Sequence, residues 1–178
     1  MAGRVAPAVA LDAGMRRVTG GAVVVLEAGL EPDGDIVSPL IEALADPGVA
    51  VAGAWGSVTA DARRFTPASS GAVDVLDPGC LAFRRADYVA RGPFDERFVG
   101  ADWFAIWLTL VLRDEGPDRP ARTALVVPGL PIAHPEAPAV DADRPDDEAV
   151  ARARKRDFYR VVDRFGRRHD LLGGGRPS

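Results

Sequence analysis

The sequence predicts a single α/β domain, and three observations carry this prediction. Residues 22–26 and 49–54 are apolar runs of strand length, and the segment between them has helical composition. Strand, helix and strand in this order predict a right-handed βαβ unit. Residues 102–115 form a helix that is apolar on every side, which predicts burial in a large core. The length of 178 residues, with 47% hydrophobic and 27% charged residues, is typical of one globular domain.

The first strand and the helix after it have clear boundaries. The run 22–26 has no polar alternation, so we expect a strand that is covered on both faces and lies in a parallel sheet. Asp35 or Ser38 is a suitable cap for the helix that follows, and Asp46-Pro47-Gly48 ends that helix.

Weaker patterns place the other elements of the body. In chain order we expect a helix at 7–17, a loop at 58–71, a strand within 73–84 that bends at Pro78-Gly79, a short helix and turn at 87–94, and a strand at 124–127.

The C-terminal region predicts an amphipathic basic helix after an acidic linker at 141–147. The helix starts at Pro145, and its apolar stripe consists of Phe158, Val161, Val162 and Phe165. From Arg152 onward the chain has nine basic and three acidic residues, whereas the remainder has thirteen and twenty-three. We expect Arg152, Lys155, Arg156, Arg160 and Arg164 to lie outside, solvated or paired with the acidic body. Phosphate, nucleic acid or anionic lipid are alternative partners, but the negative body argues against nucleic acid.

Composition also narrows the cellular context. The longest uncharged apolar run, 103–112, is too short for a bilayer, which requires about 20 residues. No signal-peptide pattern is present at the N-terminus. Cys80 is the single cysteine, so it has no internal disulfide partner, and we expect it to be a small buried residue. A reducing, cytoplasmic location fits best.

Three polar residues lie at positions where a catalytic or ligand-binding role is possible. Asp102 opens the apolar helix, where it is either a cap and dipole partner or a catalytic base. Glu27 follows the first strand, where it is either a solvated loop acid or a ligand to a metal or sugar. His134 lies among prolines, where it is either a loop hydrogen-bonding group or a metal ligand.

The order of motifs from Ala10 to about Leu172 resembles glycosyltransferase family 2, the inverting sugar transferases with the GT-A fold. The segments that carry the resemblance are Ala10-Leu11-Asp12-Ala13-Gly14 with Thr19-Gly20, residues 23–29, residues 80–85, residues 92–98, Asp102, His134 and Arg156-Asp157-Phe158-Tyr159-Arg160.

The resemblance implies a set of roles. Asp102 falls at the family's catalytic base, and Glu27 and His134 fall at metal ligands for a divalent cation, Mg²⁺ or Mn²⁺. The substrate-binding residues would be Trp103, Asp95, Glu96 and Trp55. From local pattern alone, Trp103 is otherwise a core residue, and Asp95 and Glu96 otherwise order their turn. The partners would be a nucleotide-sugar donor and a hydroxyl acceptor.

The sequence also departs from the family on the donor side. Glu27-Ala28-Gly29 replaces the family's Asp-x-Asp motif, and Leu11-Asp12 replaces an Arg-Asn pair. The family's N-terminal nucleotide-binding half has no counterpart in this sequence. The resemblance therefore implies a truncated GT-A-like three-layer sandwich with a mixed sheet over residues 1–140. A linker and the basic helix would follow at 141–172, and a disordered tail at 173–178.

Two consequences follow for partners and function. The strand at 23–26 would lie mid-sheet in the full fold, so one of its edges is bare and we expect a homodimer or a partner protein to cover it. Three functions stay open: a sugar transferase with Asp102 as base that another chain or protomer completes; a catalytically inactive relative that binds a ligand or partner; and an enzyme of different chemistry in the same pocket.

Overall fold

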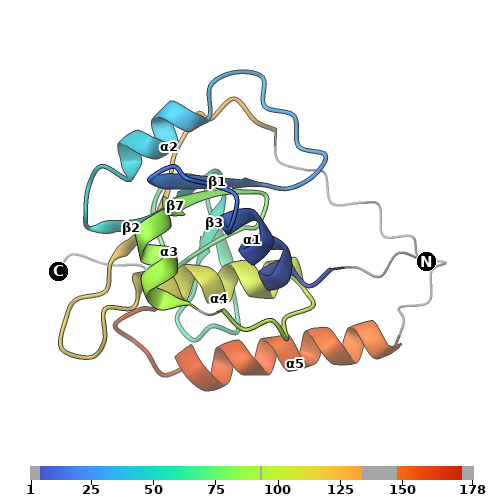
Figure 1. Cartoon of the computed structure of the whole chain (residues 1–178). Helices are drawn as coiled ribbons and strands as arrows, with labels where there is room; N and C mark the ends of the chain where they lie inside the picture. The colour runs from blue at the N-terminus through green and yellow to red at the C-terminus, as the bar shows by residue number, and fades with distance from the viewer. Residues whose placement is uncertain (1–4, 93, 134–147, 174–178) are drawn as a thin grey trace.

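The computed structural model describes residues 5–92, 94–133 and 148–173. A mixed sheet forms the centre of the molecule, as Figure 1 shows. Helix α2 (Val37–Ala43) covers one face, and α1 (Pro7–Met15), α3 (Arg85–Arg91) and α4 (Ala101–Arg113) cover the other. Helix α5 (Glu148–Phe165) packs on the outer side of α4. The predicted α/β class and mixed sheet are confirmed.

The larger sheet has the strand order β1-β7-β2-β8-β5. Its strands are β1 (Ala22–Leu26), β2 (Val49–Gly53), β5 (Gly71–Val73), β7 (Cys80–Arg84) and β8 (Thr123–Val126). Strand β7 is antiparallel to both of its neighbours, β2 and β8 are parallel, and β5 and β8 are antiparallel.

The expectation that residues 22–26 belong to a parallel sheet is wrong. Strand β1 pairs antiparallel with β7, and β7 separates β1 from β2. The two strands of the predicted βαβ unit do run in the same direction, because both are antiparallel to β7. The apolar run instead reflects the burial of both faces of β1. Val23 belongs to the core cluster on one face of the sheet, and Val24 packs against the core cluster on the other face. Coverage alone does not fix the direction of the neighbouring strand.

The predicted loop at 58–71 is also wrong in part. A second, small sheet of order β4-β3-β6 contains β3 (Gly56–Val58), β4 (Thr66–Ala68) and β6 (Val75–Leu76). Strands of two or three residues are too short to show an alternating pattern in sequence. The turn at Pro78-Gly79 divides the predicted strand 73–84 into β6 and β7.

The helices lie close to their predicted positions. The Asp35 carboxylate accepts hydrogen bonds from the Val37 and Ser38 amides at 2.9 and 3.0 Å, which anchors the start of α2. Helix α4 is buried over most of its length. Val161, Val162 and Phe165 of α5 are buried as predicted, and Cys80 is a buried free thiol whose pKa burial raises.

The basic side chains of α5 divide into two groups. Arg152, Lys155, Arg156 and Arg164 are exposed, as predicted. Arg160 is half-buried instead, because it forms ion pairs with Asp157 and Asp95 of 2.8 and 3.8 Å. Arg164 extends over the ring of Trp107 at 4.7 Å, a favourable cation–π geometry. None of the helices in the described ranges is long and apolar enough to cross a bilayer.

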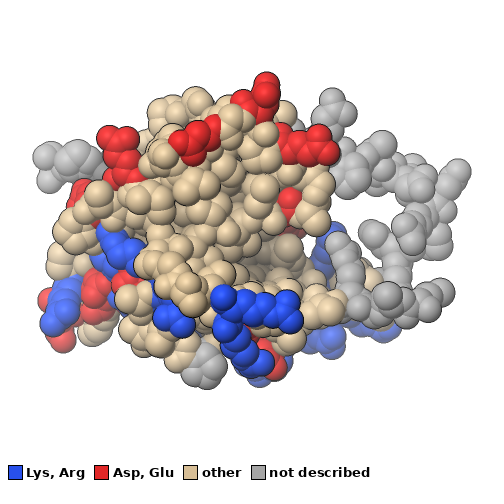
Figure 2. Space-filling view, turned by 45° about the horizontal axis from the view of Figure 1, so that its top comes forward, with Lys and Arg blue, Asp and Glu red and all other residues tan. Residues whose placement is uncertain are grey.

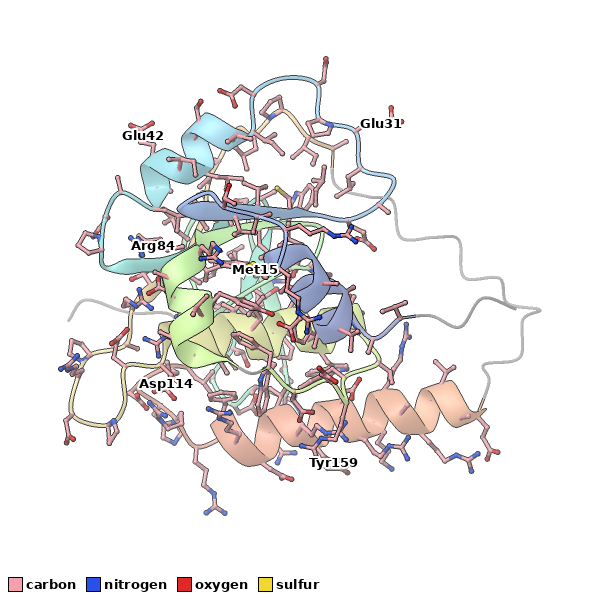
Figure 3. All side chains as sticks on the ribbon, viewed as in Figure 1. Met15, Glu31, Glu42, Arg84, Asp114 and Tyr159 are labelled. Carbon is pink, nitrogen blue, oxygen red and sulfur yellow. The ribbon has the colours of Figure 1, made fainter. Side chains whose placement is uncertain are left out.

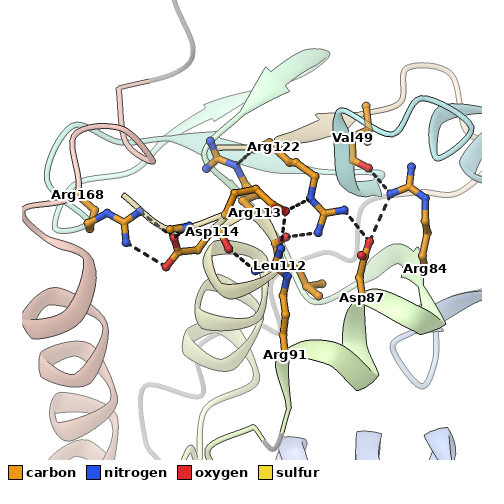
Figure 4. Close-up of polar contacts among 11 residues, drawn as sticks. Val49, Arg84, Asp87, Arg91, Leu112, Arg113, Asp114, Arg122 and Arg168 are labelled. Carbon is orange, nitrogen blue, oxygen red and sulfur yellow. Dashed lines mark hydrogen bonds and ion pairs between the residues drawn. The ribbon is translucent and has the colours of Figure 1, made fainter. Parts of the chain in front are cut away.

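A network of arginines closes the end of α4 (Figure 4). The buried Arg113 donates hydrogen bonds to three backbone carbonyls, those of Arg122, Asp74 and Leu171, at 2.8, 2.6 and 2.9 Å. The Asp74 carboxylate lies 3.9 Å from Arg113 and accepts a hydrogen bond from the Thr59 amide at 2.6 Å. Burial lowers the pKa of Arg113. These bonds connect α4, β8, the β5–β6 turn and the C-terminal segment.

Candidate functional site

A cavity of about 1280 Å³ lies where β1 and β2 end and α4 begins. The loop after β1 supplies Glu27 and Glu31, the residues after β2 supply Trp55, and the turn before β7 supplies Asp77 and Gly79. Asp102 lies at the α4 end, and α5 supplies Arg154. On the face shown in Figure 2, Asp and Glu side chains prevail in the upper part and Lys and Arg in the lower part. The cavity thus has several carboxylates and a cation from α5.

Backbone hydrogen bonds fix the position of Glu27 directly after β1. Its amide donates to the Gly79 carbonyl at 2.8 Å, and its carbonyl accepts a hydrogen bond from Leu30 at 3.2 Å, which turns the chain away from the sheet. Gly29 in this turn has a φ of 98°, a conformation that favours glycine. The carboxylates of Glu27 and Glu31 are exposed, and neither bonds to another described residue; Figure 3 shows Glu31 on the loop after β1.

Asp102 lies in the first turn of α4 without acting as its cap. Gly100 is the N-terminal cap residue, and no side chain completes the cap. The Asp102 carboxylate is exposed and forms no hydrogen bond or ion pair with another residue of the described segments. The helix dipole still favours a negative charge at this position. The local geometry therefore shows that Asp102 does not cap the helix.

The carboxylate that orders this helix start is Asp157 of α5. Its Oδ2 accepts hydrogen bonds from the Val99 and Gly100 amides at 2.9 and 3.0 Å. Its Oδ1 accepts a hydrogen bond from Arg160 at 2.8 Å, and the residue is fully buried. Asp157 thus fixes the backbone that presents Asp102, while Asp102 remains available to a ligand.

Trp55 forms an apolar part of the wall. Its indole ring lies against the turn before β7: a Cβ added to Gly79 would come within 2.8 Å of Trp55 Cζ3. A glycine at position 79 is thus required for this approach. The half-buried ring offers the cavity a flat apolar surface.

Three residues that the sequence assigned to substrate binding lie elsewhere. Trp103 does not line the cavity and makes edge-to-face contacts with Phe65 and Phe158, at centroid distances of 6.0 and 5.3 Å. Asp95 and Glu96 line a separate cavity of about 510 Å³. Hydrogen bonds from Arg97 are the main reason that the pKa of Asp95 is lowered, so this carboxylate orders its own turn.

The metal prediction rests on Glu27 and His134, and His134 lies outside the described residues. Within the described residues, no group of three His, Cys, Asp or Glu side chains could hold a metal ion. Glu27 and its described neighbours therefore do not form a metal site by themselves.

Sequence reasoning missed three cavity residues, Glu31, Asp77 and Arg154. The sequence does indicate a position at the cavity for Asp77, because it precedes the Pro78-Gly79 bend at a strand end. It gives no such indication for Glu31 and Arg154, because loop acids and basic residues on helices are common on any surface.

Comparison with known proteins adds no relative. No protein-family model matches the chain, and no curated protein matches it. The fold and the cavity are therefore the observations from which a function is inferred.

Proposed function

We propose that this protein is glycosyltransferase-like and that the large cavity is its sugar site, with Asp102 as general base. One observation supports this proposal above the others. Glu27, Trp55 and Asp102 come from three distant segments of the chain, were assigned to one active site from sequence, and line one cavity. Such convergence of polar and aromatic groups in one cavity is typical of ligand sites.

The proposed reaction needs one proton acceptor. The oxygen of an acceptor hydroxyl attacks the anomeric carbon of a nucleotide-sugar, and its proton passes to the Asp102 carboxylate. The bond from that carbon to the diphosphate breaks, and the nucleoside diphosphate leaves with the electron pair. An exposed carboxylate without a competing partner among the described residues suits this role. The cavity exceeds the roughly 300–1,000 Å³ of ordinary small-molecule pockets, which leaves space for two substrates.

A divalent cation, Mg²⁺ or Mn²⁺, remains part of the proposal through Glu27 together with His134. Such an ion would neutralise the leaving diphosphate. Because the described donors alone do not form a site, the role of Asp102 above is derived without the ion.

A second candidate function is a catalytically inactive relative that binds a sugar or a partner protein. The absence of a three-ligand acidic group among the described residues favours this candidate. The replacement of the family's second metal acid by Gly29 favours it too. With a sugar as its ligand, the inactive relative uses the same cavity as the transferase, and the two differ in whether a nucleotide-sugar binds with the help of a metal.

We expect Glu27→Gln to weaken nucleotide-sugar binding in the presence of Mn²⁺ at least tenfold, because Glu27 is the described carboxylate assigned to the metal. Isothermal titration calorimetry with a panel of nucleotide-sugars measures this effect. Glu42→Gln is the matched control: Glu42 is an exposed glutamate of α2 that does not line the cavity (Figure 3).

The titration separates the candidates. Binding of a nucleotide-sugar that requires Mn²⁺ supports the transferase. Binding of free sugars alone, with no response to Mn²⁺, supports the inactive relative. No heat with any nucleotide-sugar or sugar would overturn both the transferase and the sugar-binding relative.

A further inference from the structure

Strand β1 ends the larger sheet, and no strand of the described part of the chain pairs with its outer edge. The Arg85 amide donates to the Gly21 carbonyl, and the Glu27 amide donates to the Gly79 carbonyl, both at 2.8 Å. In an antiparallel pair, hydrogen-bonded positions alternate. Residues 21, 23, 25 and 27 therefore face β7. Ala22, Val24 and Leu26 present their backbone N–H and C=O groups at the open edge.

Among the described residues, the other edges of the two sheets are protected, whereas the edge of β1 is not. Strand β4 contains Pro67, which removes a donor. Strands β5 and β6 have only three and two residues, too few to template a new strand. Strand β1 has five aliphatic residues, with no charge and no proline, and its pairing with β7 is regular. An uncharged, regular edge of this length is a surface that pairs with another strand.

Exposed aliphatic side chains accompany this edge. Most of the large exposed hydrophobic residues lie on or just before α1, on β1 and on α2, which cover the two faces of the sheet beside β1 (Figure 1). They are Val5, Val9, Leu26, Val37 and Ile41, each at least 38% exposed. Each helical layer of the sheet therefore carries exposed aliphatic side chains.

We propose that a second copy of this chain pairs with β1 in antiparallel orientation and forms a homodimer with a continuous sheet. A two-fold axis through Val24, perpendicular to the sheet, places Ala22 opposite Leu26 of the partner subunit and Val24 opposite its own counterpart. All three residues have outward-facing backbone groups, so each facing pair exchanges two hydrogen bonds. Because this axis keeps the corresponding faces of the two sheets on the same side of the dimer, α1 of one copy faces α1 of the partner subunit, and α2 faces α2. The exposed aliphatic residues of one copy then face the same residues of the other.

Charge complementarity also favours a second copy. The same register places Gly21 opposite Glu27 of the partner subunit. Arg16 and Arg17, which precede this position, are exposed and form no ion pair with another residue of the described ranges. In the dimer they approach the partner's Glu27 and the partner's Glu31, whose carboxylates also bond to no described residue. The dimer thus brings cations of one subunit to the acidic end of the cavity of the other.

Sedimentation velocity over a range of protein concentrations tests the proposal on the full chain. We expect the wild type to sediment at twice the chain mass of 18.8 kDa. Leu26→Lys places a charge on the edge at an exposed position, and we expect it to raise the dimer dissociation constant at least tenfold. Val89→Lys, at a 61% exposed position of α3, is the matched control and leaves the dimer unchanged.

A cysteine variant tests the register directly. In the proposed pairing the two Val24 Cα atoms lie about 5.5 Å apart, within the range that a disulfide spans. We expect Val24→Cys to form a covalent dimer on mild oxidation, and Val89→Cys to remain a monomer in the same denaturing gel. Circular dichroism confirms that each variant is folded. A wild type that stays monomeric at all concentrations overturns the proposal. So does a dimer that folded Leu26→Lys leaves intact or that Val24→Cys does not cross-link.

Discussion

Asp102→Asn is expected to lower the rate of sugar transfer by roughly 10²–10⁴ and to leave the fold unchanged. The amide keeps the shape of the side chain but cannot take the proton of the acceptor hydroxyl. Stability should not change by more than about 0.5 kcal/mol, because the Asp102 carboxylate is exposed and bonds to no other described residue. The measurement is the initial rate of nucleoside diphosphate release, with the donor that calorimetry identifies.

Asp163→Asn is the control for charge. Asp163 is an exposed aspartate of α5 that does not line the cavity, so its replacement should leave the rate unchanged. Full turnover by Asp102→Asn would exclude Asp102 as the base. A transferase would then need another carboxylate of the same cavity, of which Asp77 is the most enclosed.

Arg113→Met is expected to lower the free energy of unfolding by about 3–5 kcal/mol. Methionine fills much of the same space but leaves the carbonyls of Arg122, Asp74 and Leu171 without their donor. It also leaves the buried Asp74 carboxylate without the positive charge at 3.9 Å. At about 2–4 °C per kcal/mol for a domain of this size, the melting temperature should fall by roughly 10 °C.

Thermal unfolding followed by circular dichroism measures this change. Arg119→Met is the matched control, because Arg119 is exposed in the loop between α4 and β8, and it should change the melting temperature by no more than about 2 °C. A fall for Arg113→Met no larger than that of the control would show that the hydrogen bonds and the ion pair of Arg113 contribute little to stability.

Local sequence patterns predict the positions of most elements but not their pairing. The boundaries of β1 match the prediction, and those of β2, α1 and α4 agree to within two residues. The insertion of β7 between β1 and β2 could not be predicted from β1 and β2, because it is a contact between segments distant in the chain. The strands of the small sheet were missed, because they are too short to carry a period.

The same limit applies to the candidate site. The sequence places Asp102 at a helix start, where a cap and a base are equally compatible with the local pattern. The structure bears on the cap alone: Asp157 binds the backbone before α4 from a helix far along the chain. Trp103 belongs to the same helix turn as Asp102 but packs against aromatic residues, because consecutive positions on a helix face different directions.

An NMR titration of the isotopically labelled protein with nucleotide-sugars and Mg²⁺ tests the central claim most directly, that the large cavity is the sugar site. The proposal predicts that the amide signals of residues 27–31 and 99–102 and the indole N–H signal of Trp55 shift together and saturate with one dissociation constant. Signals around Arg97, in the second cavity, should stay unchanged. Saturable shifts confined to that second cavity, or no shifts with any sugar ligand, would contradict the account.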